Sequence, residues 1–145
     1  MYKRIVLAYD GSESGQKALL DCQELAQWAQ SELTLVAVTP LHMDLIGVEG
    51  GIYDRQLMEK DKQALQDVLD EGLRRLRGMG RKASGQVLVG DTVDEVTKHA
   101  RLVSADLIVV GHKHLDGWAA RWWRGSISKA LIEHSPCSVL VVITR

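Results

Sequence analysis

The chain has 145 residues, of which 46% are hydrophobic and 26% are charged, and its formal net charge is -1 at pH 7. This length fits one domain, residues 1–145, with a core that needs no disulfides or metals, and the composition excludes a disordered chain. The near-neutral charge argues against a general nucleic-acid binder, whose surface would be strongly basic.

The cysteine count and the first residues of the chain indicate a compartment. Only Cys22 and Cys137 are present, which excludes a disulfide scaffold and favours a reducing interior. The opening stretch MYKRIVLAYD has an apolar run too short for a signal peptide or a membrane span. We therefore expect a cytoplasmic protein without a membrane partner.

Short apolar runs alternate with amphipathic segments along the chain. The runs are rich in Val, Ile and Leu and mostly unbroken, a pattern typical of strands that are buried on both faces. The segments between them place apolar residues three and four positions apart, which predicts helices with one apolar stripe each. The predicted strands cover 5–9, 33–38, 87–89 with its flanks, 107–110 and 139–143, and the helical stripes cover 18–29, 65–76 and 93–103.

Residues at the segment boundaries support these helices. Ser12 or Ser14 can cap the first helix, and Thr92 with Glu95 has capping-box spacing at the start of the third. The stretch 41–53, with three glycines, is predicted to be a mobile loop that acts as a lid or a partner surface. Residues that end helices follow the second and the fourth: Gly78 and Gly80, and Pro136.

Strict alternation of strand and helix predicts the α/β class. It implies a parallel sheet with right-handed crossovers and helices on both faces. In such sheets the ligand crevice lies beyond the carboxyl ends of the strands, where the winding direction reverses. The loops YDGSES after the first strand, VTPLHM after the second and the segment from Gly111 after the fourth are therefore the places to seek a site.

Four stretches together resemble the universal stress protein family over essentially the whole chain: RIVLAYDGSESGQKAL, VGDTVDEV, SADLIVVGHK and RGSISKALIEHSPCSVLVV. The resemblance implies a Rossmann-like, doubly wound five-stranded parallel sheet in the order 3-2-1-4-5. It also implies a stress-response module that forms a homodimer through its C-terminal edge strand.

One branch of that family resembles a nucleotide-binding module, and its glycine motif can be laid on this chain. The first glycine falls on Gly111 and the last on Gly125, but His114 stands at the second position and one extra residue separates it from Gly125. ATP or AMP, with Mg²⁺ for ATP, is the implied ligand. The candidate contacts are Asp10, Ser12, Val38, Gly111, His114, Gly125, Ser126, Ile127 and Ser128.

The departure at His114 bears on phosphate binding. A glycine there would let backbone amides approach the anion, whereas an imidazole adds steric bulk. The helix that opens at Ser126 keeps unpaired amides and a positive dipole end, and its hydroxyls can add donors. Asp10 can orient a ribose, hold Mg²⁺ or act as a base, or it can simply fix the turn into the first helix.

The remaining aromatic and polar residues leave several readings open. The tryptophans can stack on a base, contact a protein partner or plug the end of the sheet. The HKH histidines have no carboxylate or thiol beside them at ligand spacing, so they are predicted to be exposed loop residues rather than metal ligands. A buried, inert thiol is expected at Cys22. These residues are Trp118, Trp122 and Trp123, with His112 and His114, and the isolated His42, His99 and His134, which are expected at the surface or at helix ends.

No nucleophile with a paired base, no metal cluster and no acid pair is visible in the sequence. A regulatory module that binds adenine nucleotide and acts through dimer or partner contacts is therefore favoured over an enzyme. Two alternatives remain: an ATP-hydrolysing or adenylate-transferring enzyme that uses Asp10 and Mg²⁺, and a dimeric interaction protein without a nucleotide site. The terminal strand SVLVVITR is expected to pair with its copy in the homodimer.

Overall fold

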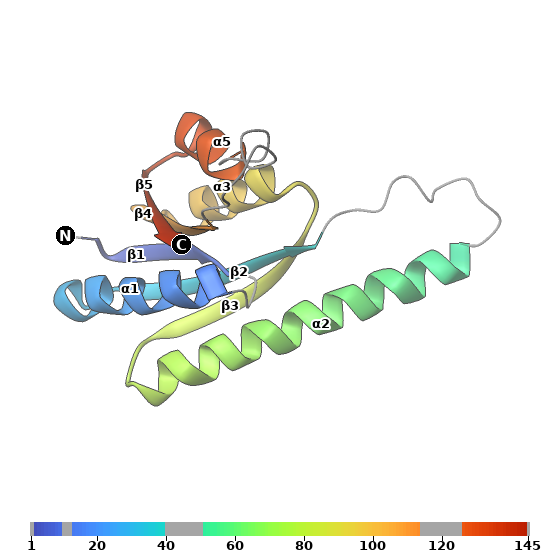
Figure 1. The fold of residues 1–145 in the computed structure, drawn as a ribbon, viewed down its shortest axis with the longest axis horizontal. Helices are drawn as coiled ribbons and strands as arrows, with labels where there is room; N and C mark the ends of the chain where they lie inside the picture. Colours follow the sequence, from blue (N-terminus) through green and yellow to red (C-terminus); the bar gives the residue numbers. More distant parts are fainter. Residues whose placement is uncertain (1, 10–12, 40–50, 114–125, 145) are drawn as a thin grey trace.

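The structure, a computed structural model, describes residues 2–9, 13–39, 51–113 and 126–144. Strands and helices alternate through these ranges (Figure 1). In chain order they are β1 (Arg4–Ala8), α1 (Glu13–Ala29), β2 (Glu32–Thr39), α2 (Gly51–Gly78), β3 (Ala83–Val89), α3 (Thr92–Leu102), β4 (Leu107–Lys113), α5 (Ser126–His134) and β5 (Ser138–Thr144).

The strands form one parallel sheet in the order β3-β2-β1-β4-β5. Helices α1 and α2 lie on one face of the sheet, and α3 and α5 lie on the other (Figure 1). The predicted fold class, a doubly wound five-stranded sheet with this strand order, is therefore confirmed. The winding reverses at β1, whose Ala8 lies opposite both Val36 of β2 and Val110 of β4.

Each face of the sheet packs its own apolar core, because successive side chains of a strand point to opposite faces. On β1, Ile5 and Leu7 pack against α1 and α2, whereas Val6 packs against α3 and α5. Cys22 of α1 is fully buried in the first core, and this burial raises the pKa of its thiol to about 12. The predicted burial of this thiol is confirmed.

Strand β3 departs from the prediction that all strands are buried on both faces. Ser84, Gly85 and Gln86 are exposed, because β3 lies at the end of the sheet and pairs only with β2. The guanidinium of Arg77 donates through Nε and Nη2 to the carbonyl oxygen of Ala83, at 3.1 and 2.9 Å. This contact covers the first outward-facing carbonyl of the edge strand.

Two of the predicted helix caps are wrong. Helix α3 is capped by Asp91, which has extended backbone angles (φ -73°, ψ 133°) and whose carboxylate accepts the backbone N–H of Asp94 at 3.0 Å. Thr92 is already the first helical residue, so it cannot serve as the N-cap. Ser14 likewise lies inside α1, and Ser12 lies outside the described residues.

Helix α2 is longer than its apolar stripe predicts. It begins at Gly51, so the predicted loop 41–53 is too long by three residues, and it extends well beyond the sheet (Figure 1). Its end is confirmed at the glycines, because Gly80 has a φ of 76° and donates its N–H to Arg77, while Arg81 donates to Leu76. Among the helices within the described ranges, none has both the length and the apolar run that crossing a bilayer demands.

Candidate functional site

The carboxyl-terminal edge of the sheet brings together parts of the predicted site. Ala8 near the end of β1 lies level with Val36 and Val110, so Val38 and Gly111 lie at the same edge on either side of β1. Val38 is half-buried and packs against the α3 and α5 core, and Gly111 lies opposite Val142 of β5. These two positions therefore flank the point where the winding reverses, as predicted for a crevice.

Helix α5 adds backbone donors to this edge. It connects the carboxyl end of β4 to the start of β5, so its first turn, from Ser126, lies at the carboxyl-terminal edge. The first four amides of a helix have no partner within the helix, and they carry its positive dipole end. Ser128 is 8% exposed and Ile127 is 43% exposed. The first turn holds no acidic residue.

Helix α3 starts at the same edge but is electrostatically different. The carboxylate of Asp91 already accepts the Asp94 amide, and Asp94 and Glu95 both lie in the first turn. These carboxylates neutralise the positive end of α3 and would repel a further anion. Of these two helix starts, that of α5 is the one suited to negatively charged groups.

Four predicted contacts lie outside the described residues: Asp10, Ser12, His114 and Gly125. The same holds for His42 and for the tryptophans at 118, 122 and 123. Val38 of β2, Gly111 of β4 and the first residues of α5, Ser126, Ile127 and Ser128, are described. The nucleotide role of all nine positions remains a prediction.

His99 lies at a helix end, one of the two predicted places, and its side chain is buried. Its side chain is 7% exposed in the last turn of α3, and its Nε2 atom is buried without a hydrogen-bond partner among the described residues. Burial lowers the pKa of this imidazole. The expected helix-end position is therefore confirmed for His99, although its side chain is buried, and His134 is exposed at the end of α5. Within the described ranges, no three His, Cys, Asp or Glu side chains gather closely enough to hold a metal ion.

Sequence comparison places the chain in a family. The model of the universal stress protein family matches residues 1–142. The chain belongs to the universal stress protein family. A universal stress protein of Staphylococcus saprophyticus is 31% identical over 152 residues, covering 99% of this chain and 85% of the relative. The resemblance seen in the sequence is confirmed.

Solved structures of the family share the fold. A family protein from Burkholderia pseudomallei is 25% identical and superposes with a TM-score of 0.78, covering 97% of this chain and 96% of that one. A universal stress protein in complex with cAMP is 22% identical, with a TM-score of 0.73 over 99% of this chain and 98% of that one. A family protein of Arabidopsis thaliana with AMP bound is 16% identical, with a TM-score of 0.71 over 99% and 92% of the two chains.

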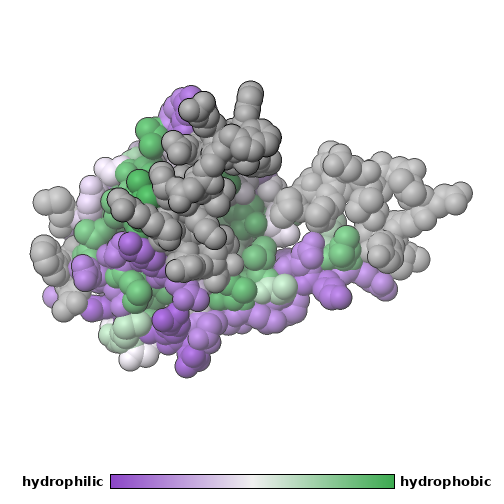
Figure 2. Space-filling model, in the orientation of Figure 1, coloured by the Kyte–Doolittle hydropathy of each residue, from purple (hydrophilic) through white to green (hydrophobic). Residues whose placement is uncertain are grey.

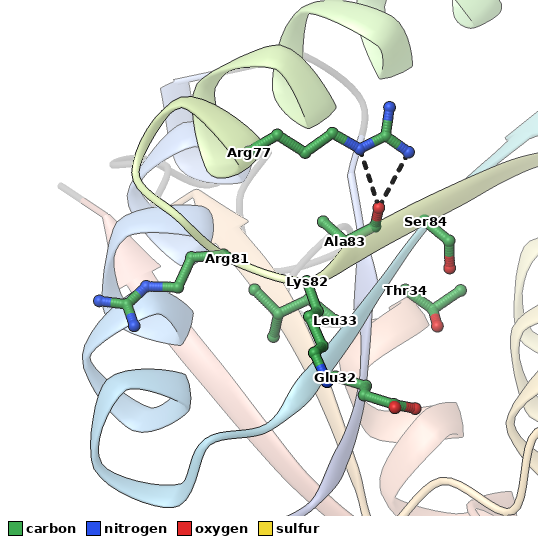
Figure 3. Close-up of a pocket in the computed structure, with 8 residues that line it drawn as sticks. All are labelled: Glu32, Leu33, Thr34, Arg77, Arg81, Lys82, Ala83 and Ser84. Atoms are coloured by element: carbon green, nitrogen blue, oxygen red, sulfur yellow. Dashed lines mark hydrogen bonds between the residues drawn. The ribbon is translucent and has the colours of Figure 1, made fainter.

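A cavity of about 350 Å³ at the opposite, amino-terminal edge of the sheet was not predicted (Figure 3). Three of the side chains that line it are cationic: Arg77, Arg81 and Lys82. The signal in the sequence is the cluster of basic residues after α2. That cluster alone does not reveal that β2 completes the lining.

Proposed function

We propose that this universal stress protein binds an adenine nucleotide at the carboxyl-terminal edge of the sheet, between β1 and β4. The observation that carries the proposal is the start of α5, whose first turn has no acidic residue and includes the buried Ser128, and whose first amides have no partner within the helix. A phosphate group would satisfy these amides. Val38 offers an apolar contact for the base, and Asp10 and Ser12 follow β1 in the sequence.

The related structures support a small nucleotide. Their ligands are cAMP, AMP and, in an Archaeoglobus fulgidus protein, dAMP. These share adenine, one sugar and one phosphate, and dAMP lacks the 2′-hydroxyl group. We therefore take AMP as the minimal ligand of this chain, with ATP and Mg²⁺ as the larger form. His114 stands where a glycine would let backbone amides reach further phosphates, which favours the shorter ligand.

Ligand release and thermal stability test nucleotide binding. Protein purified from cells is denatured, and the released small molecules are analysed by mass spectrometry. A ligand at 100 times its Kd stabilises the fold by about 2.7 kcal/mol, which raises Tm by roughly 5–10 °C for a chain of this size. Gly111→Val should abolish this rise, because its methyl groups occupy the place of closest backbone approach, whereas Gly78→Ala should retain it. Finding no released nucleotide and no Tm shift at millimolar AMP or ATP would refute the proposal.

The protein acts by binding rather than by turnover in this proposal. Phosphate release from ATP should be no faster than in a Gly125→Val variant, since no paired nucleophile and base is evident. Steady release above that variant would favour the enzyme alternative instead. The proposed role is a cytoplasmic stress-response module that signals through its own dimer and a protein partner.

The difference between the two edge strands, β3 and β5, supports a homodimer that pairs through β5. The ladder bond from the Leu33 amide to the Lys82 carbonyl directs the backbone groups of Ala83 away from β2, and Arg77 covers that carbonyl. Strand β5 has no polar residue between Val139 and Ile143, and hydrophobic side chains gather along it (Figure 2). An apolar edge strand favours pairing with a second copy.

Light scattering tests this interface. Val141→Pro removes a backbone donor from β5 and should give monomers, whereas Val141→Thr keeps the donor and the β-branched shape and should remain dimeric. Circular dichroism must show that both variants are folded. A folded Val141→Pro dimer would contradict the β5 interface and leave the nucleotide site unaffected.

A further inference from the structure

The cavity at the amino-terminal edge of the sheet lies at the end opposite to the proposed nucleotide site. It is about 350 Å³ and is bounded by the starts of β2 and β3 and by the last turn of α2 (Figure 3). Its lining comes from segments that lie far apart in the chain and meet because β2 and β3 pair in parallel. The lining residues are Glu32, Leu33, Thr34, Arg77, Arg81, Lys82, Ala83 and Ser84.

The cavity carries more positive than negative charge. Arg77, Arg81 and Lys82 are cationic, and Glu32 is the one acidic residue in the lining. This excess contrasts with the chain as a whole, whose formal net charge is -1. A local field of this sign attracts anions.

The cations at 81 and 82 are not required to cap helix α2. The terminal carbonyls of Leu76 and Arg77 already accept the amides of Arg81 and Gly80. Gly80 supplies the positive φ that this turn needs, so the backbone fixes where Arg81 emerges. The charges of Arg81 and Lys82 are therefore available for another purpose.

Several donors in the cavity have no partner among the described residues. The Nε atom of Arg81 is buried and makes no hydrogen bond, which is unfavourable unless a ligand or water accepts it. Arg77 uses Nε and Nη2 on the Ala83 carbonyl, which leaves Nη1 free for a further acceptor. Thr34 and Ser84 are register partners, so their hydroxyls lie next to each other, on the face of the sheet opposite to the one on which α2 packs (Figure 3).

The arrangement of the cations bears on the shape of the anion. In Figure 3 the guanidinium of Arg81 points away from the side chain of Lys82, and Arg77 lies on a third side. Charges distributed in this way match an anion with several charged groups along its length better than a single small ion. Flexible Arg and Lys side chains can contact such a ligand at separate phosphates.

We propose that this cavity binds an extended phosphate chain, with Arg81 and Lys82 as its main cationic contacts. The hydroxyls of Thr34 and Ser84 donate further hydrogen bonds, and the Glu32 carboxylate weakens binding by repulsion. The site is separate from the nucleotide site and does not depend on it.

Calorimetric titration of the full chain with inorganic tripolyphosphate at low salt tests the site. One equivalent should bind, and the double variant Arg81→Gln, Lys82→Gln should bind at least tenfold more weakly. Glu32→Gln should bind about fourfold more tightly, the effect of removing a unit charge about 5 Å from one ligand charge in water. Arg74→Gln removes a cation of α2 that pairs with Glu71 outside the cavity, and its affinity should stay within about twofold of the original.

Competition separates this site from the proposed nucleotide site. Saturating AMP should not displace tripolyphosphate, and Gly111→Val should bind it normally. The proposal is wrong if no binding is seen at millimolar tripolyphosphate, if the double variant binds normally, or if Gly111→Val removes binding. The last outcome would place the anion at the carboxyl-terminal edge. A failure of AMP binding alone would leave this proposal intact.

Discussion

Gly72 of α2 offers a direct test of how closely this helix packs on the sheet. A Cβ atom added there would lie 2.7 Å from Cε1 of Tyr9 and 3.0 Å from Cδ2 of Leu35. Carbon atoms prefer separations of about 3.5–4.0 Å. Tyr9 and Leu35 are both buried in the core, so neither side chain can move away freely.

The expected effect of Gly72→Ala is a balance of two contributions. Alanine favours a helix interior over glycine by about 1 kcal/mol, whereas forcing a methyl group into a packed core costs about 1–3 kcal/mol. The net change lies between no effect and a destabilisation of about 2 kcal/mol. Gly78→Ala, near the end of the same helix, meets no atom within 4 Å and should stabilise by about 0.5–1 kcal/mol.

Urea unfolding of both variants measures the steric contribution, because the chemical change is the same in each. Gly72→Ala should have the lower midpoint, with an unchanged slope, and the two free energies of unfolding should differ by about 0.5–3 kcal/mol. Equal stabilities, or a more stable Gly72→Ala variant, would refute the argument from close packing. Because the added methyl group presses on Tyr9, which immediately precedes Asp10, the same variant also tests how tightly the end of β1 is packed.

Three further predictions concern single side chains. Because burial lowers the pKa of His99, the unfolded chain binds its proton more readily, so stability should fall as pH drops below about 6.5. Urea midpoints between pH 5 and 8 should show this slope, and His99→Leu should lose much of it. The Cys22 thiol, with its pKa of about 12, should not react with a thiol reagent at pH 8 in a Cys137→Ser background until the protein is unfolded; rapid native labelling would contradict its burial. Asp91→Ala should cost about 1 kcal/mol of unfolding free energy and Thr92→Ala much less; the reverse order would restore Thr92 as the cap.

The alternation of apolar runs and helical stripes was sufficient to predict the fold class. The strands β1, β2 and β4 lie at the centre of the sheet, where burial on both faces gives unbroken runs of Val, Ile and Leu. Strand β3 was harder to predict from the sequence, because its edge position exposes residues such as Ser84 and Gln86, which interrupt the run of apolar residues. The cap at Asp91 was missed because Thr92 and Glu95 have the same spacing as a capping box.

The sequence predicted the position of the candidate site at one edge of the sheet, but not the second cavity. The carboxyl ends of parallel strands meet at one edge, so the loops after β1, β2 and β4 could be assigned to it from the alternation of strands and helices, whereas Val38 and Gly111 were named from the family resemblance. The second cavity depends on which strands are neighbours at the opposite edge. Thr34 and Ser84 are fifty residues apart in sequence, and only the register of β2 against β3 brings their hydroxyls together.

The different chemistry of the two sheet edges limits the size of any assembly built by strand addition. Along β3, Arg77 occupies an outward carbonyl and Ser84 and Gln86 are polar, while β5 carries an apolar row. A sheet that accepts a neighbour on one side only can join a single copy, after which no receptive side is left. A sheet open on both sides would instead polymerise into a ribbon. By occupying the Ala83 carbonyl, Arg77 leaves β3 with one acceptor fewer for a further strand.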